Sequence, residues 1–175
     1  GAYALGEVAG ATSAKSSMGV NLLYKAGPLG VGYSYHKDNL QAVAGGVINP
    51  VEAHTVAASY DFGMIKPVVI YQQSEDKAAF ARDQKVLTAG ATFKINAASR
   101  VIATYSLIDD DTKTATGKQG ETEQLAVGYS YDMSKRTSLY AALAATSQDA
   151  TAKKLGAAVN GADVREVTVG IRHKF

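Results

Sequence analysis

The side chains best suited to catalysis or metal binding are three histidines and a run of three aspartates. The histidines share no motif, and no H-E-x-x-H spacing is present. They are His36, His54 and His173. Asp109, Asp110 and Asp111 could offer oxygen ligands to Ca²⁺, although adjacent acids in a polar segment are more commonly just solvated. With 0 cysteines, the chain excludes thiol chemistry and Cys-ligated metals. We therefore expect no enzyme activity and no cofactor, and keep the three aspartates as a weak metal candidate.

The elements that would position these residues alternate with a period of two. In Val164–Phe175 the residues at 167, 169, 171 and 175 are apolar, whereas most of those between them are charged or small. Alternate side chains of a strand point to opposite faces, and the helical period of 3.6 is absent. The pattern predicts an all-β fold of about ten strands. The predicted segments are 1–7, 17–25, 29–36, 54–62, 65–72, 86–95, 100–107, 124–132, 138–145 and 164–175.

The connections between these segments alternate in length. Short turns are predicted at 26–28, 63–64, 96–99 and 133–136, and long polar loops at 8–16, 37–53, 73–85, 108–121 and 146–163. Short turns on one side and long loops on the other are typical of an outer-membrane β-barrel. Pro67 removes a backbone donor, so we expect a bulge or a weak pairing there. A soluble β-sandwich acting as a binding module is the alternative.

Length and composition narrow the class further. The 175 residues predict one domain, residues 1–175, and no apolar run is long enough for a transmembrane helix. The net charge of +2 is too small to indicate nucleic-acid binding. Because no starting Met or signal peptide is present, we expect a mature or excised piece.

The polar face of the predicted strands carries more bases than acids. If the strands form a membrane β-barrel, this face surrounds a water-filled lumen, and the excess of bases predicts a mild preference for anions. Alternatively, the same charges only anchor strand ends at the membrane interface. The predicted pore-lining residues are Lys25, Asp61, Lys66, Gln72, Lys94, Arg100, Gln124, Asp132, Tyr140, Glu166, Arg172 and Lys174.

Aromatic residues on the opposite, apolar face predict a girdle at the membrane interface, since tyrosine suits the boundary between lipid and water. These residues are Tyr24, Tyr35, Tyr60, Tyr71, Tyr129 and Tyr131.

Four strings resemble the general porins of Gram-negative bacteria, of the type found in β-proteobacteria. They are YDMSKRTSLYAAL (Tyr131–Leu143), VGIRHKF (Val169–Phe175), GEVAGATSA (Gly6–Ala14) and YKAGPLGVGYSY (Tyr24–Tyr35). The resemblance runs through nearly the whole chain.

The resemblance implies an outer-membrane diffusion porin for small hydrophilic solutes and ions. It implies an antiparallel barrel of about sixteen strands, of which this chain would be the C-terminal portion. It further implies a homotrimer in contact with outer-membrane lipid and lipopolysaccharide, and an assembly signal at Phe175 read by the barrel-assembly machinery. The family's constriction loop would lie outside this chain. A small outer-membrane barrel with an enzymatic or adhesive extracellular rim is the alternative.

Overall fold

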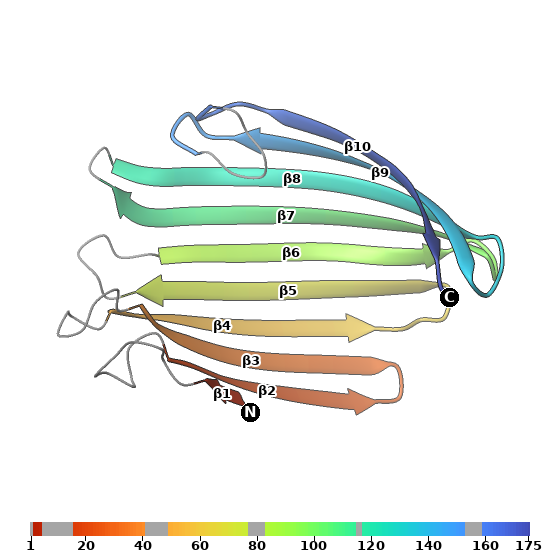
Figure 1. Ribbon diagram of the computed structural model, residues 1–175, viewed down its shortest axis with the longest axis horizontal. Coiled ribbons are helices and arrows are strands. Elements are labelled where there is room, and N and C mark those ends of the chain that lie inside the picture. The colour runs from red at the N-terminus through yellow and green to blue at the C-terminus, as the bar shows by residue number, and fades with distance from the viewer. Residues whose placement is uncertain (1, 5–15, 41–48, 77–82, 115–116, 153–158) are drawn as a thin grey trace.

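The computed structural model describes residues 2–4, 16–40, 49–76, 83–114, 117–152 and 159–175. These residues form one antiparallel sheet whose strands follow one another in chain order (Figure 1). The strands are β1 (Ala2–Ala4), β2 (Ser17–Ala26), β3 (Leu29–Leu40), β4 (Asn49–Tyr60), β5 (Ile65–Asp76), β6 (Asp83–Lys94), β7 (Ser99–Thr114), β8 (Gly117–Asp132), β9 (Thr137–Gln148) and β10 (Val164–His173). The all-β prediction of about ten strands is confirmed. No helix in the described part of the chain has the length and hydropathy needed to span a bilayer.

The sheet curves, and its later strands bend round at the end that carries the short turns (Figure 1). Among the described residues, each strand from β1 to β10 pairs only with its sequence neighbours. Antiparallel partners directly opposite each other share a face, so the register extends each face across the whole sheet. Tyr129, for example, lies opposite both Val101 and Ala141.

The short turns form where local chemistry favours them. Asp61 Oδ1 accepts the Gly63 backbone N–H at 2.7 Å, and Asn96 Oδ1 accepts the Ala98 N–H at 2.8 Å. Ser134 Oγ accepts the Thr137 N–H at 3.0 Å. A side-chain oxygen that bonds a backbone N–H two or three residues further on closes a turn locally. The strand bounds confirm all four predicted turn positions, and in the turn between β2 and β3 Gly27 has a φ of +54°.

The long-loop end departs from the prediction. Strands β3 to β8 extend well into segments predicted as loops, and β7 and β8 are 16 residues long each. The three aspartates lie in β7, where Asp109 is opposite Glu121 and Asp110 opposite Gly120. Strand pairing is a backbone property, so polar side chains on both faces do not end it. The prediction of a loop at 108–121 is therefore wrong for 108–114 and 117–121, which lie in strands, and residues 115–116 are outside the described part of the chain.

Pro67 lies within β5 without a bulge toward β6, because the β5–β6 register runs unbroken from Ile65 to Glu75. On its other side the described β4–β5 register ends at Ser59 and Val68, next to the proline. The expected bulge is therefore wrong, whereas the expected weak pairing is confirmed on the β4 side, where the ladder ends beside the missing N–H.

The described part of the β9–β10 connection folds back onto β8. The Asp149 N–H donates to the Glu121 carbonyl at 2.9 Å, and the Glu121 N–H donates to Asp149 Oδ2 at 3.1 Å. Gly120 has a φ of +80°, and a Cβ there would lie 2.6 Å from Thr151 Oγ1. This connection is therefore anchored to the sheet by backbone hydrogen bonds and close packing.

One face of the sheet exposes large apolar side chains. Leu143, Val167 and Val169 are 60%, 75% and 74% exposed. Among the residues that the structure describes, the only fully buried apolar side chain is Ala152. A soluble fold would bury such side chains away from water, so the apolar core expected of a sandwich is not found in the described residues.

Candidate functional site

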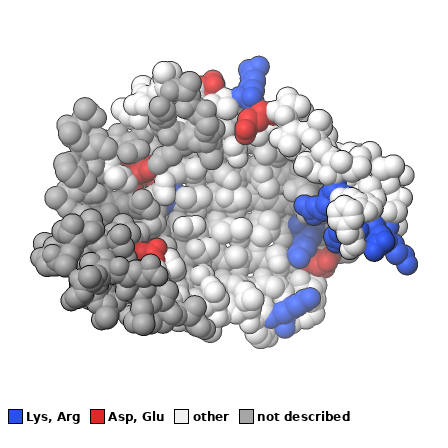
Figure 2. All heavy atoms as spheres, in the orientation of Figure 1, with Lys and Arg blue, Asp and Glu red and all other residues white. Residues whose placement is uncertain are grey.

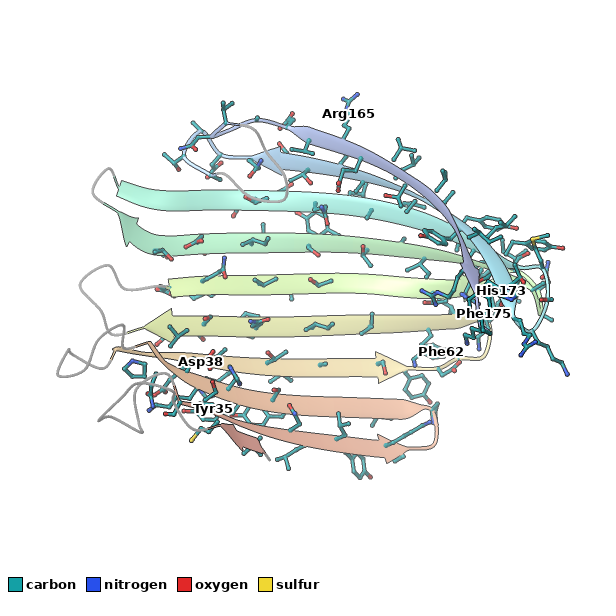
Figure 3. The ribbon with its side chains drawn as sticks, in the orientation of Figure 1. Tyr35, Asp38, Phe62, Arg165, His173 and Phe175 are labelled. Atoms are coloured by element: carbon teal, nitrogen blue, oxygen red, sulfur yellow. The ribbon has the colours of Figure 1, made fainter. Side chains whose placement is uncertain are left out.

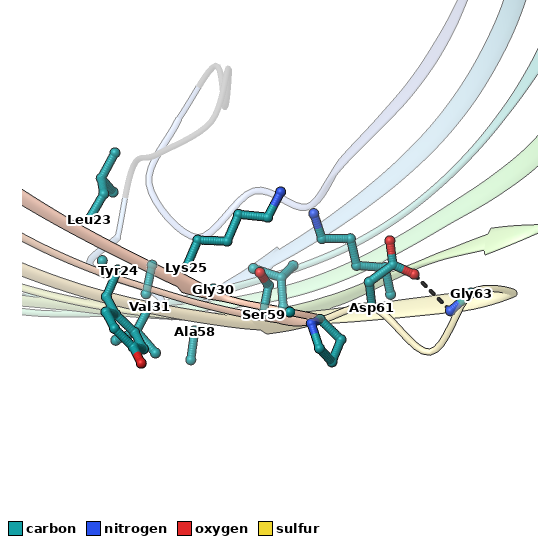
Figure 4. Close-up of a pocket in the computed structure, with 15 residues that line it drawn as sticks. Leu23, Tyr24, Lys25, Gly30, Val31, Ala58, Ser59, Asp61 and Gly63 are labelled. Atoms are coloured by element: carbon teal, nitrogen blue, oxygen red, sulfur yellow. Dashed lines mark hydrogen bonds between the residues drawn. The ribbon is translucent and has the colours of Figure 1, made fainter.

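The residues predicted to line a pore lie on one face of the sheet. In the strand register, several of these residues lie directly opposite a small residue on the same face: Lys25 lies opposite Gly30, Tyr140 opposite Gly170, and Glu166 opposite Ala144. Figure 4 shows Lys25, Ser59 and Asp61 on the side toward which the later strands curve, and Tyr24, Val31 and Ala58 on the other side. We call these the polar face and the apolar face.

Two hollows mark the polar face at its short-turn end. The β2–β5 hollow encloses roughly 630 Å³ and contains Lys25, Asp61 and Lys66 (Figure 4). Lys94 Nζ lies 3.8 Å from Asp61 Oδ2. The acid at this hollow therefore lies near one base, Lys94, while Lys25 and Lys66 line the same hollow.

The β7–β10 hollow encloses roughly 530 Å³ at the other side of the same end. Its charged lining residues come from three strands, a turn and the chain end, and they are Arg100, Asp132, Lys135, Arg136, Arg172 and Lys174. Figure 2 shows blue Lys and Arg side chains gathered at this end of the molecule. Arg100 Nη1 donates to Asp132 Oδ2 at 3.0 Å, and Arg100 Nη2 donates to Ser130 Oγ at 3.1 Å. The single acid of this hollow is thus already held by one of its five bases.

Lys135 and Arg136 are functional candidates that sequence reasoning missed. They lie in the turn between β8 and β9, where alternation does not give the direction of a side chain. The available signal was their charge within the Ser-Lys-Arg-Thr string.

Leu23 is an apolar side chain on the polar face, which the alternation did not predict, and 89% of its surface is exposed. This face is therefore mixed in polarity at its β2 end.

Tyr140 lies against the sheet on the polar face. A Cβ at Gly170 would lie 2.4 Å from the Tyr140 Oη atom, so only glycine leaves room for this ring position. Further toward the long-loop end, hydroxyl and amide side chains pair across strands. Gln124 Nε2 donates to Thr146 Oγ1 at 3.1 Å. Gln72, predicted for the same surface, lies opposite Thr55.

The three aspartates do not converge on a point. Asp109 and Asp110 are successive strand residues and point to opposite faces. Asp110 Oδ1 accepts the Thr112 backbone N–H at 3.0 Å, and its other oxygen accepts from Gln84 Nε2 at 3.2 Å. Across the described residues no three His, Cys, Asp or Glu side chains are grouped to hold a metal ion.

The histidines are dispersed, and each has a nearby polar partner. His36 Nε2 lies 2.9 Å from Asp38 Oδ2, His54 Nδ1 lies 2.9 Å from Tyr33 Oη, and His173 Nδ1 lies 2.9 Å from Thr137 Oγ1. Figure 3 shows His173 beside Phe175, with ring centroids 5.0 Å apart. None of these contacts pairs a nucleophile with a base and an orienting acid, the arrangement that nucleophilic catalysis uses.

The tyrosines predicted as a girdle lie on the apolar face. Tyr24 lies opposite Val31, Tyr71 opposite Leu87, and Tyr131 opposite Leu139. Near the long-loop end this face becomes polar. There Lys37 Nζ donates to Glu52 Oε1 at 2.8 Å. At the long-loop end the apolar surface thus gives way to polar groups, as expected where a membrane surface ends.

Comparisons with known proteins agree with this geometry. A family model described as Gram-negative porin matches residues 1–151. The chain is 30% identical over 168 residues to outer membrane porin protein 32 of Delftia acidovorans, covering 90% of this chain and 46% of that protein. It is also 30% identical to an outer membrane porin protein of Bordetella pertussis, covering 88% of this chain and 45% of that protein.

Solved structures give the same result. An anion-selective porin from Comamonas acidovorans superposes with a TM-score of 0.81 at 28% identity, covering 99% of this chain and 54% of that one. A trimer form of OmpT from Vibrio cholerae superposes with a TM-score of 0.70 at 14% identity, covering 90% of this chain and 56% of that one, and shows likeness of fold. The chain spans about half the length of the relatives it matches. It belongs to the Gram-negative porin family.

Proposed function

We propose that this chain forms part of the wall of a water-filled channel in the Gram-negative outer membrane. The channel passes small hydrophilic solutes and ions with a mild preference for anions. The observation that carries the proposal is the separation of faces: an exposed apolar face that becomes polar at the long-loop end, and a polar face with charged hollows at the short-turn end. Lipid would contact the first face and water the second.

The sheet needs partners to close. In the described structure, β1 and β10 each pair with a single neighbour. Unpaired backbone groups are costly in hydrocarbon, so membrane sheets close into barrels. We propose that further strands complete a barrel of about sixteen, as in large porins. Residues 1–175 would be one continuous part of that single barrel domain.

The family also supports proposals about partners. These are assembly as a homotrimer, contact with lipopolysaccharide at the polar rim of the apolar face, and reading of Phe175 by the barrel-assembly machinery. Phe175 is fully exposed, which would leave it accessible. The family points to a channel rather than an enzyme, and no described cluster favours an enzymatic or adhesive rim.

Charge supports the anion preference. The predicted pore-lining set contains six bases and three acids, and Asp61 and Asp132 both lie beside bases. Lys135 and Arg136 add two positive charges at the short-turn end. An excess of one sign inside a low-dielectric wall raises the local concentration of counter-ions.

The test is ion selectivity in a planar lipid bilayer. The full-length protein that contains this chain is reconstituted, and the reversal potential is measured across a KCl gradient. We expect stable channels and a reversal potential of the sign set by chloride. Absence of conductance would refute the channel, whereas a potassium-selective reversal potential would refute only the anion preference.

A further inference from the structure

We propose that the β7–β10 hollow is a binding site for a small, doubly charged oxyanion, such as phosphate or a dicarboxylate, at the short-turn mouth of the channel. The placement at a mouth depends on the proposed function. Binding to the hollow itself depends only on the charges and geometry of the described residues.

Charge is the first argument. The hollow has one acid, Asp132, and its carboxylate is held by Arg100 at 3.0 Å. In the described structure the other four bases of the hollow, Lys135, Arg136, Arg172 and Lys174, form no ion pair. They therefore present positive charge to a concave surface, where field lines are focused. Planar guanidinium groups can also bind carboxylate or phosphate oxygens bidentately.

Preorganisation is the second argument, because the two backbone segments that carry these bases are joined. The Lys174 N–H donates to the Arg136 carbonyl at 2.9 Å, which ties the chain end to the turn. Within the turn, Ser134 Oγ accepts the Arg136 N–H at 3.2 Å. Arg172 lies opposite Ser138 in the β9–β10 register. Little backbone ordering is needed for the bases to act together, which favours binding.

The β2–β5 hollow provides the contrast. The β2–β5 hollow is of similar size but contains only two bases, Lys25 and Lys66, and its acid Asp61 lies 3.8 Å from Lys94. Both hollows lie on the polar face at the short-turn end. A general positive potential would attract anions to both hollows, whereas a specific binding site predicts tight binding at the β7–β10 hollow alone.

The experiment measures binding independently of conduction. Phosphate, or succinate in a second arm, is titrated into the detergent-solubilised full-length protein by isothermal titration calorimetry, at low chloride and about pH 8, where phosphate is mostly doubly charged. Wild type is compared with Lys135→Gln/Arg136→Gln and with the matched control Lys25→Gln/Lys66→Gln, which removes the same charge. Arg172→Gln, from a different strand, gives an independent variant if the turn substitutions impair folding.

We expect saturable binding in wild type, weakened about tenfold or more by the turn variant and by Arg172→Gln, since each removes a charge-assisted hydrogen bond. The control should change the affinity by less than about twofold. Equal loss in the control and the turn variant would overturn the site in favour of a general potential, and so would an absence of saturable binding. Preference for phosphate over succinate, or the reverse, identifies which oxyanion the site takes. Binding without conductance would refute the channel but keep the site, whereas anion-selective channels without binding would do the opposite.

Discussion

Ala141 and Ala142 offer a matched test of which face contacts lipid. They are successive residues of β9, so they have the same wild-type side chain and opposite orientations. Ala141 lies opposite Tyr129 and Val169 on the apolar face, and Ala142 lies opposite Gly128 and Thr168 on the polar face. Replacing each by arginine places an identical charge on either side of one strand.

The expected loss of stability follows from the depth of Ala141 in the membrane. Ala141 is four residues beyond the start of β9, which at about 3.4 Å per residue and a tilt of about 40° places it about 10 Å along the membrane normal. The apolar band of such barrels is about 25 Å tall, so this position is close to its middle. Arginine there costs about 2–4 kcal/mol. In Ala142→Arg the guanidinium would project into water, over the small residues Gly128 and Thr168, and the substitution should cost less than about 1 kcal/mol.

The assay is equilibrium folding of the full-length protein into phospholipid vesicles against guanidinium, followed by the change in gel mobility. We expect Ala141→Arg to lower the free energy of unfolding by about 2–4 kcal/mol and Ala142→Arg to leave it nearly unchanged. Equal destabilisation by the two variants, or a larger effect at Ala142, would refute the assignment of the apolar face to lipid.

Three further predictions follow from single contacts. Gly170→Ala should push the Tyr140 ring off the sheet and lower the single-channel conductance; an unchanged conductance in a folded variant would show that the ring does not line the pore. Gly120→Ala places a Cβ 2.6 Å from Thr151 Oγ1 at a φ of +80°. It should destabilise the contact between the β9–β10 connection and β8 by about 1–3 kcal/mol. The measurement is the rate of proteolysis of this connection, which should rise; proteolysis at the wild-type rate would contradict the prediction. Asp132→Asn should raise the anion-to-cation permeability ratio and change stability by under about 1 kcal/mol, because its ion pair is over a third exposed; a lower ratio would contradict the role of charge at this mouth.

Alternation predicted the faces because it depends only on the two-residue period of a strand. Once Lys25, Arg100 and Tyr140 were placed in strands, their common face followed. The turns could be predicted equally well from the sequence, since Asp61 and Asn96 accept hydrogen bonds from backbone groups two or three residues away. Both features are local, and local chemistry can be read from sequence.

The remaining features depend on contacts between distant residues. The extension of β7 through Asp109 could not be predicted, because polar side chains on both faces give no apolar alternation there. Backbone hydrogen bonds to β8 stabilise this part of the strand. The pairing of Lys94 with Asp61 joins residues 33 positions apart, one at the end of β6 and the other in the turn between β4 and β5. The β7–β10 hollow was missed because turn residues such as Lys135 follow no alternation.

The strict neighbour order from β1 to β10 has a kinetic consequence. Each described ladder joins segments separated by one connection only, the longest being that between β9 and β10. Loop-closure entropy grows only slowly with length, and a low contact order favours fast folding. The described sheet can therefore grow one hairpin at a time from any pair already formed. If the proposed barrel forms, its slow step would be the single closure between its first and last strands, whose separation in sequence would be the greatest of any pair.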